Sequence, residues 1–137
     1  MNTEKTIFEK IIAGEIPCTK IYEDDDIFAF LDIQPNNFGH TLVITKVPYK
    51  NIYELPNDLD GKFMNAVKKI SIAVKKSMSA DGINLAMNND ISAGQEVFHI
   101  HMHVIPRFVG DTFAHGRHLK YEEGQMDKVA NRIIAEL

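Results

Sequence analysis

The stretch VFHIHMHVIPR, residues 97–107, alternates histidines with apolar side chains. Successive side chains of a β-strand point to opposite faces, so this alternation predicts a strand over residues 97–105. His99, His101 and His103 would then lie side by side on one face of that strand. The same face carries Val97 and Ile105, and the opposite face, which we expect to pack against a core, carries Phe98, Ile100, Met102 and Val104.

A metal site is one interpretation of this row. Zinc binds imidazole nitrogens at about 2.0–2.1 Å, whereas a rise of about 3.3 Å per residue places His99 and His103 roughly 13 Å apart. The three rings of a straight strand therefore do not converge on one ion without His40 or nearby carboxylates. Histidines that only pack and form hydrogen bonds are a second interpretation, which explains one such residue better than three.

The third interpretation is a nucleophilic histidine at the centre of the row. A neutral imidazole is a good nucleophile near neutral pH because its ordinary pKa is about 6.5. It can attack phosphorus, carry the transferred group and leave when water attacks. His99 and His103 would orient the ring of His101 or protonate a leaving group. A backbone carbonyl or a second histidine has to hold one ring nitrogen as a donor, so that the other is free to react.

Polar residues outside the histidine row supply groups that phosphate chemistry needs. Asn88, Gly94 and Gln95 lie in a glycine-containing loop that leads into the strand, and such a loop can offer backbone N–H groups to phosphate oxygens. Asp32 stands in an otherwise apolar stretch. From composition alone, a structural partner and a ligand hydroxyl explain this acid equally well.

The rest of the chain predicts an α+β domain built on an antiparallel sheet of about five strands. Apolar residues at steps of three and four predict one long amphipathic helix over Leu59–Met78, with Asn57 or Asp58 as its cap. Short helices are predicted near the two ends, at residues 7–12 and 126–137. The other predicted strands are residues 20–23, 27–33, 41–45 and 82–87, the first two flanking an acidic turn, Asp24–Asp26, which is more typical of solvent exposure than of a metal site.

Composition limits the classes of function. The 137 residues correspond to a single domain, 1–137, and 45% hydrophobic residues are enough for one core. A net charge of −4 argues against a protein that binds nucleic acid. Cys18 is the only cysteine, which excludes an intramolecular disulfide. Because we find neither a signal peptide nor an apolar stretch of roughly 20 residues, we expect a cytoplasmic protein that does not bind a membrane. The lysines that cluster on the long helix, Lys68, Lys69, Lys75 and Lys76, are interpreted as its solvated side.

These residues resemble a known family. The pattern HIHMHVI after Phe98 looks like that of the histidine triad (HIT) nucleotide hydrolases and transferases. The blocks TIFEKIIAGEIP, AFLDIQP, GHTLVITK and NLAMNNDISAGQEVFHIHMHVIPR also occur in the family's order. The chain is most similar to the small Hint branch, the histidine triad nucleotide-binding proteins. The resemblance implies an HIT-like α+β fold, a homodimer whose two sheets join into one, a purine nucleotide pocket in each subunit, and no cofactor.

By position, the resemblance also implies roles for individual residues. His101 matches the nucleophile that attacks the α-phosphorus, and His99 and His40 match the hydrogen-bonded histidines around it. His103 matches a contact to the phosphate or leaving group, and Asp32 matches the acid that binds the ribose hydroxyls. The phosphate contacts match Asn88, Gly94 and Gln95, followed by Glu96, and the apolar walls around the base match Ile7, Phe8, Ile11, Ile16, Phe30, Ile33 and Leu42.

Two features depart from the family pattern. Thr6 and Glu9 stand where some bacterial relatives have the Cys-x-x-Cys of a zinc site, and Tyr49 stands roughly where they have a further histidine ligand. We therefore expect no metal. Glu96 stands where a serine or threonine is common. An ionised carboxylate cannot donate a hydrogen bond to phosphate as a hydroxyl does, so substrate preference is expected to differ.

The resemblance favours a hydrolase that cleaves the P–N bond of adenosine or guanosine 5′-phosphoramidates and releases AMP or GMP. The alternative enzyme would hydrolyse dinucleoside polyphosphates with the same nucleophile. In a different class, the chain would be a purine nucleotide-binding or scaffold protein whose catalysis is incidental. His115 and His118 match no family histidine and are interpreted as surface residues.

Overall fold

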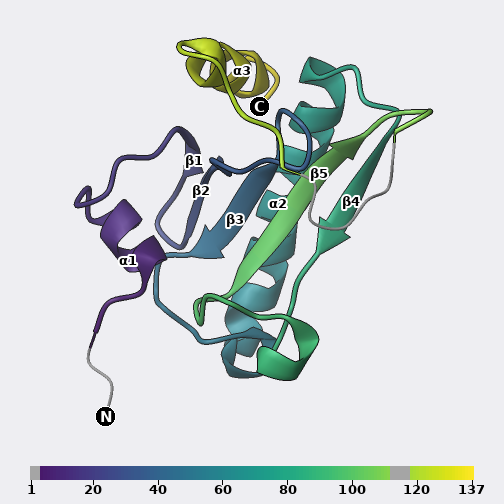
Figure 1. Ribbon diagram of the computed structural model, residues 1–137. Helices are drawn as coiled ribbons and strands as arrows, with labels where there is room; N and C mark the ends of the chain where they lie inside the picture. The colour runs from purple at the N-terminus through teal and green to yellow at the C-terminus, as the bar shows by residue number, and fades with distance from the viewer. Residues whose placement is uncertain (1–3, 112–117) are drawn as a thin grey trace.

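The computed structural model describes residues 4–111 and 118–137. Within them, a five-stranded antiparallel sheet in the order β1-β2-β3-β5-β4 packs against one long helix, α2 (Figure 1). The expected α+β class is therefore confirmed. The strands are β1 Lys20–Glu23, β2 Ile27–Leu31, β3 Thr41–Thr45, β4 Gly82–Ala86 and β5 His101–Arg107. The helices are α1 Ile7–Ile12, α2 Asp60–Ser77 and α3 Gln125–Ile134, with 3₁₀ turns η1 Ile52–Glu54, η2 Asn57–Leu59 and η3 Ile91–Ala93.

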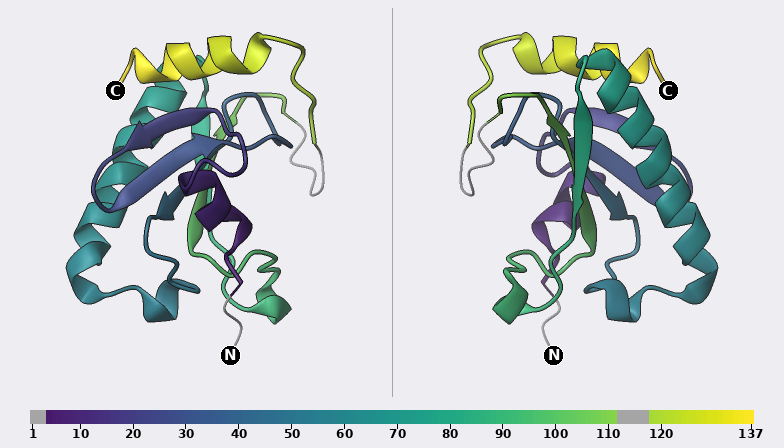
Figure 2. Two further views of the ribbon diagram at one scale, coloured as in Figure 1. Left: turned by 90° about the vertical axis from the view of Figure 1, so that its left-hand side faces the viewer. Right: turned by 90° about the vertical axis from the view of Figure 1, so that its right-hand side faces the viewer.

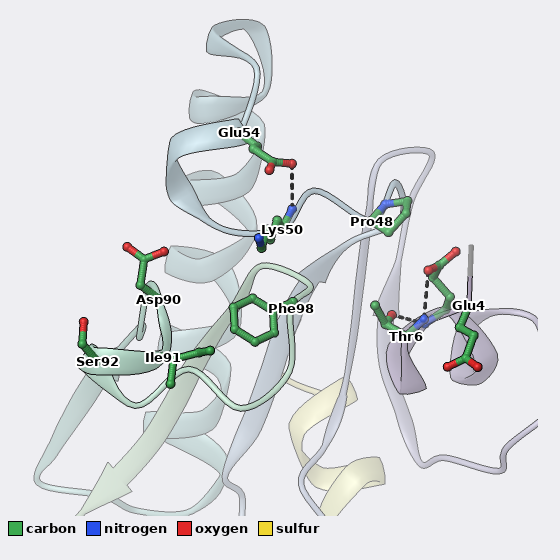
Figure 3. A pocket seen from close by; sticks show the side chains of 10 residues that line it. Glu4, Thr6, Pro48, Lys50, Glu54, Asp90, Ile91, Ser92 and Phe98 are labelled. Atoms are coloured by element: carbon green, nitrogen blue, oxygen red, sulfur yellow. Dashed lines mark hydrogen bonds between the residues drawn. The ribbon is translucent and has the colours of Figure 1, made fainter. Parts of the chain in front are cut away.

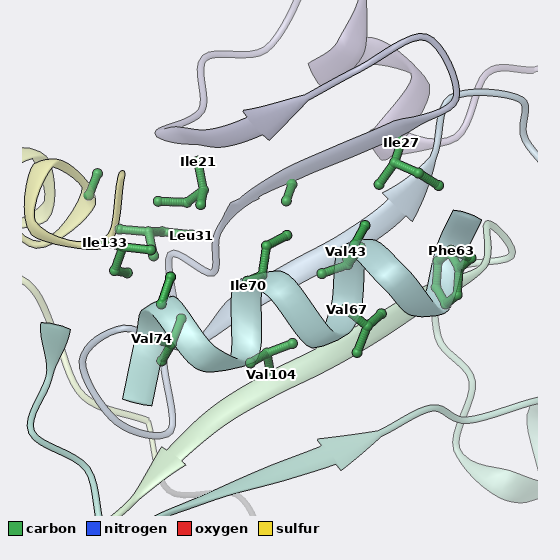
Figure 4. Packing of buried hydrophobic residues seen from close by; sticks show 14 of the residues in the cluster. Ile21, Ile27, Leu31, Val43, Phe63, Val67, Ile70, Val74, Val104 and Ile133 are labelled. Carbon is green, nitrogen blue, oxygen red and sulfur yellow. The ribbon is translucent and has the colours of Figure 1, made fainter. Parts of the chain in front are cut away.

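The main core lies between α2 and one face of the sheet. An amphipathic helix buries the side chains that recur at steps of three and four. Figure 4 shows this stripe of α2 facing Val43 of β3 and Val104 of β5. Helix α3 closes one end of this core, where Ile133 is fully buried (Figure 2). The buried side chains of the α2 stripe are Phe63, Ala66, Val67, Ile70, Ala73 and Val74.

Helix α1 covers part of the opposite face of the sheet (Figure 2). Its first turn is closed by a capping box, in which the Thr6 hydroxyl accepts from the Glu9 N–H and the Glu9 carboxylate accepts from the Thr6 N–H. Phe8 points into the sheet from this helix and is buried. The second apolar cluster on this face consists of Phe8, Phe28, Phe30, Leu42 and Ile44.

Two expectations about local structure are wrong. Strand β5 begins at His101 rather than at residue 97, because the N–H of Ile100 donates to the carbonyl of Tyr49 (2.8 Å) outside the sheet. Phe98 is consequently only half-buried and lies under the Lys50 ammonium, 5.3 Å from its ring centre, instead of in the core. The second concerns the start of α2, where the 3₁₀ turn η2 runs directly into the helix. Leu59 occupies the capping position with helical dihedral angles, so neither Asn57 nor Asp58 is the cap.

The acidic turn between β1 and β2 is held by its own side chains. The Asp24 carboxylate accepts from the N–H groups of Asp26 and Ile27, both at 2.8 Å, which is an Asx turn. The turn therefore has a structural explanation. Among residues 4–111 and 118–137, no helix combines the length and apolar character that a membrane span requires.

Candidate active site

The sheet register places two of the three histidines at its centre. His101 is paired with Ile44 of β3, and His103 is paired with Leu42 of β3 and with Ala86 of β4. His99 lies two residues before β5 begins, yet it is completely buried. The rings of His101 and His103 are neighbours, with centres 5.2 Å apart. The three histidines therefore form a row, although only the last two belong to a regular strand.

The hydrogen bonds of His101 define which of its nitrogens is free. Nδ1 lies 2.7 Å from the backbone carbonyl of His99, and because a carbonyl only accepts, Nδ1 carries the proton. Burial lowers the pKa of His101, so the ring is neutral near pH 7 and Nε2 keeps its lone pair. A backbone carbonyl thus holds this imidazole in the tautomer that a nucleophile requires.

His99 is fixed from both sides. Its Nε2–H donates to the carbonyl of Thr45 at 2.6 Å, so Nδ1 accepts from the Thr6 hydroxyl at 2.9 Å. Burial lowers the pKa of His99, with the Thr45 carbonyl acting in the opposite direction. The same Thr6 oxygen accepts from the Glu9 N–H. The cap of α1 therefore holds His99, and the backbone of His99 in turn holds the ring of His101.

His40 and His103 form a second hydrogen-bonded pair. The N–H of Asn36 donates to Nδ1 of His40 at 3.0 Å, which leaves the His40 proton on Nε2. That Nε2–H donates to Nδ1 of His103 at 2.9 Å. Burial lowers the pKa of His40 to about 3 and that of His103 to about 4, and repulsion between neighbouring histidines adds to both shifts. Both rings are neutral at pH 7, and the proton of His103 lies on Nε2, available to a ligand.

One group of side chains has the spacing of a metal site. Ligand atoms of Asp32, His40 and His103 all lie within 4.8 Å of one another. A metal-bound histidine needs a lone pair toward the ion and normally donates its other N–H to an oxygen. Nε2 of His40 instead carries a proton, because its Nδ1 faces the Asn36 N–H. Hydrogen bonding explains this group, and its protonation does not fit a metal ion.

The zinc site that some relatives have is also not supported by the side chains present. The positions that would supply two thiolates hold Thr6 and Glu9, which form the capping box of α1. Tyr49 packs against the main core. The Thr6 hydroxyl donates to Nδ1 of His99. In this chain a hydrogen bond from Thr6 orients His99.

Asp32 lies at the edge of the histidine cluster. Oδ1 accepts from the Gln34 N–H at 2.9 Å, and Oδ2 is 3.7 Å from Nε2 of His40. Burial raises the pKa of the Asp32 carboxyl, while the hydrogen bond from Gln34 opposes that shift. The side chain is still about one-fifth exposed, so Oδ2 can accept a hydrogen bond from a ligand hydroxyl.

The expected apolar wall is divided between packed and exposed side chains. Phe8 is packed edge-on against the imidazoles, with ring centres 5.0 Å from His101 and 5.6 Å from His99. Ile33 is 74% exposed and Ile7 is 48% exposed. These two side chains therefore contribute little to the core and remain available to a ligand. The remaining members are buried, namely Phe30 and Leu42, or half-buried, namely Ile11 and Ile16.

The loop before β5 differs from expectation in one side chain. Asn88 and Glu96 are exposed, and the Asn88 amide lies 3.3 Å from the Gly94 carbonyl. Gly94 has a φ of 93°, which glycine adopts without strain. Gln95 is turned inward, with its amide bonded to Lys50, Val97 and Asp90. No group of this side chain is left for a phosphate.

Two further features lie beside the site. A pocket of about 890 Å³ opens next to Thr6 and Phe98, and its lining includes none of the expected nucleotide contacts (Figure 3). His118 is exposed and donates from Nδ1 to the Gln34 carbonyl, close enough to Asp32 to affect its pKa. It therefore lies on the Asp32 side of the site, whereas His115 falls outside the described residues.

The sequence-based expectations missed Thr6, Asn36 and Thr45 as positioning groups. The Thr-x-x-Glu spacing of Thr6 and Glu9 is a signature of a capping box and could have identified the helix start. It could not have shown that the same hydroxyl reaches His99, a residue 93 positions away. Asn36 and Thr45 act through their backbones. Side-chain patterns carry no signal for such contacts.

Comparison with known proteins agrees with this geometry. A family model of the HIT domain matches residues 13–110. Protein hit of Bacillus subtilis is 49% identical over 111 residues, which cover 80% of this chain and 77% of that protein. Adenylylsulfatase HINT3 of Arabidopsis thaliana is 38% identical over 129 residues, which cover 94% of this chain and 66% of that protein.

A solved structure has the same fold. The Hit-like protein involved in cell-cycle regulation from Bartonella henselae superimposes with a TM-score of 0.85 at 39% identity, over 96% of each chain. The sheet and the long helix described above thus occur in a related protein whose structure is solved.

Proposed function

The chain belongs to the HIT domain family of nucleotide-binding hydrolases and transferases, and from this premise we propose that it hydrolyses purine nucleoside 5′-phosphoramidates through a covalent nucleotidyl-His101 intermediate. One observation carries the proposal. Nδ1 of His101 is held as a donor by the His99 carbonyl, and the neutral ring has its lone pair on Nε2. A binding protein has no need of an imidazole held in this way.

The first half-reaction forms a bond from Nε2 of His101 to the α-phosphorus. The bond from phosphorus to the leaving nitrogen breaks, and that nitrogen takes up a proton from solvent to depart as a free amine. The adduct keeps the proton on Nδ1 of His101, so its ring is cationic. The His99 carbonyl, 2.7 Å from Nδ1, stabilises that charge.

The second half-reaction returns the enzyme to its starting state. Water attacks phosphorus, the bond to Nε2 of His101 breaks, and the water proton is released as the nucleoside monophosphate forms. His103 contributes the N–H of its Nε2, which His40 keeps in place by donating to Nδ1. Aimed at a phosphate oxygen, this N–H stabilises the negative charge that develops in both steps.

Asp32 and the apolar cluster would bind the nucleoside. The free Oδ2 of Asp32 accepts a ribose hydroxyl, and its partial burial strengthens that hydrogen bond. Phe30 and Leu42 lie on the same side of the sheet as His101 and His103. Exposed Ile33 would close over a purine ring and remove its own apolar surface from water.

Charge near the phosphate loop favours an amine over a polyphosphate as the leaving group. Glu96 and Asp90 are both exposed in this loop, and like charges placed together oppose binding. We expect kcat/KM for adenosine 5′-phosphoramidate to exceed that for diadenosine tetraphosphate by about tenfold or more, as measured by chromatography of released AMP. Glu96→Gln should raise kcat/KM for the tetraphosphate several-fold and leave the phosphoramidate reaction within about twofold.

If the wild type instead has the higher kcat/KM for diadenosine tetraphosphate, the chain is a dinucleoside polyphosphate hydrolase. Adenylyl sulfate belongs in the same assay, because a relative is an adenylylsulfatase. Its sulfate leaves without needing a proton, so turnover of all three substrates would indicate one nucleophile with a permissive leaving-group site.

We also propose that the chain forms a homodimer through β4. This strand is at the edge of the sheet, where its outer N–H and C=O groups have no neighbouring strand among the described residues. Leu85 of β4 is exposed, and the exposed Met64 and Tyr53 line a groove together with Met87, the residue that follows β4. This groove of about 350 Å³ between η1 and α2 continues the surface. A second copy of the chain would cover both features by pairing β4 with β4.

Leu85→Arg tests the dimer. A charge at the centre of an apolar interface is desolvated without a partner, so this variant should be monomeric at concentrations where the wild type is dimeric, as measured by sedimentation velocity. Ile134→Arg is the matched control, because Ile134 is equally exposed but lies on α3. A Leu85→Arg protein with the wild-type sedimentation coefficient would rule out this interface.

A further inference from the structure

Asp90 has a backbone conformation that residues other than glycine rarely adopt. Its φ is 77° and its ψ is 157°, a region in which a Cβ atom meets its own backbone. Such a residue persists only when the surrounding structure holds it in place. Asp90 begins the η3 turn in the loop between β4 and β5, so the contacts that hold it also determine the shape of this loop.

Both backbone groups of Asp90 are hydrogen-bonded to Gln95, and the Asp90 carbonyl also accepts from the Ala93 N–H at 3.1 Å. The Asp90 N–H donates to Oε1 of Gln95 at 2.8 Å, and the Gln95 N–H donates to the Asp90 carbonyl at 3.0 Å. This reciprocal pair closes the loop from residue 90 to residue 95. Gln95 is only 4% exposed, so these hydrogen bonds form away from water.

The amide nitrogen of Gln95 connects the loop to two other segments. Nε2 donates to the Lys50 carbonyl at 2.7 Å and to the Val97 carbonyl at 3.0 Å. Figure 3 shows Asp90 and Lys50 on separate loops around Phe98. Both donors of the Gln95 amide are therefore satisfied inside the protein, and its oxygen also faces Nδ2 of Asn51 at 3.5 Å.

This connection positions the groups nearest the reactive imidazole. Ala86, the last residue of β4, pairs with His103, and Asn88 follows it by two residues, toward the end of β5 at which His101 lies. Gly94 and Gln95 use their N–H groups within the loop. The N–H of Glu96 has no hydrogen-bond partner in residues 4–111 and 118–137. It is the next backbone donor along the chain toward the histidines.

We propose that Gln95 is a positioning residue that holds the strained backbone of Asp90, and through it fixes Asn88 and the Glu96 N–H for an α-phosphate. Gln95 itself does not touch the phosphate. The inference rests on the proposed function, because it assigns this loop to the phosphate of the same nucleotide. It differs from what the family resemblance implies, namely a direct phosphate contact at this position.

The test removes the side-chain hydrogen bonds of Gln95 and then relieves the backbone strain at Asp90. Gln95→Met keeps the size of the buried side chain and loses its amide. We expect the Kd for AMP to rise about tenfold and kcat to fall about thirtyfold, because a misplaced donor costs up to about a hundredfold in rate. The Kd for adenosine should change less than about twofold, since adenosine has no phosphate. Ser92→Ala, exposed in the same loop, is the control and should behave as the wild type.

Asp90→Gly in the Gln95→Met background provides the decisive comparison. Glycine adopts the conformation of residue 90 without strain, so the double variant should recover at least about threefold in AMP affinity over Gln95→Met. A direct phosphate contact cannot be restored by glycine at position 90. Loss of AMP affinity without recovery would therefore overturn the proposal, as would wild-type AMP affinity in Gln95→Met.

Two features keep this test interpretable. If Gln95→Met does not fold, Gln95→Leu replaces it, because leucine also fills the buried position and has no oxygen to accept from the Asp90 N–H. The same rise in the Kd for AMP and the same recovery with Asp90→Gly are expected. Calorimetric binding does not depend on turnover. A wild type that binds AMP but forms no nucleotidyl-His101 would refute the proposed reaction, whereas the binding series alone decides the role of Gln95.

Discussion

His101→Ala is expected to lower kcat for adenosine 5′-phosphoramidate by about 10,000-fold or more, because it removes the atom that bonds to phosphorus. AMP should still bind within a few-fold of the wild-type Kd, since Asp32 and the apolar cluster remain. Steady-state kinetics and calorimetry on the same preparation measure the two quantities. Loss of turnover with retained binding is the pattern of a missing nucleophile rather than of a disrupted pocket.

Two controls accompany this variant. His118→Ala removes an exposed histidine whose Nδ1 donates to the Gln34 carbonyl outside the triad, and its kcat should stay within about threefold of wild type. Radiolabelled substrate quenched during turnover should leave an acid-labile label on His101 in the wild type and none in His101→Ala. Near wild-type activity of the alanine variant would eliminate the covalent mechanism.

The part of the structure that could be predicted follows from the regular spacing of apolar residues along the sequence. Alternation around residues 97–107 correctly placed His101 and His103 on one face, and the steps of three and four along α2 correctly identified its buried stripe. These patterns exist because one face of a strand or helix must be buried. Because they depend only on neighbouring residues, they predict the helices and strands that position the site.

The unpredictable part depends on contacts between distant segments. Nothing in residues 97–100 indicates that the Ile100 N–H donates to the Tyr49 carbonyl, so that β5 begins only at His101. Gln95 lies in a loop in which apolar residues have no regular spacing, so the sequence did not reveal that its amide points inward. The tautomer of His40 depends on the backbone N–H of Asn36. Each of these contacts joins groups whose proximity arises only from the completed fold.

Keeping four imidazoles neutral, three of them buried and that of His103 half-buried, has a consequence for stability. In the unfolded chain each histidine binds a proton below its ordinary pKa of about 6.5. In the folded protein His103 does so only near pH 4 and His40 only near pH 3. Between these limits the unfolded state binds more protons than the folded state. The free energy of unfolding therefore falls as pH decreases through this window.

We expect the protein to lose about 2 kcal/mol of unfolding free energy per pH unit between pH 6 and pH 5, because each such histidine contributes up to about 1.4 kcal/mol per unit. Urea denaturation at closely spaced pH values measures this slope. His103→Gln should reduce it by about half, since glutamine accepts from His40 without titrating. A slope that is the same in the wild type and His103→Gln would mean that His103 is protonated in the folded state at these pH values. The neutral tautomers from which the reaction has been derived would then be incorrect.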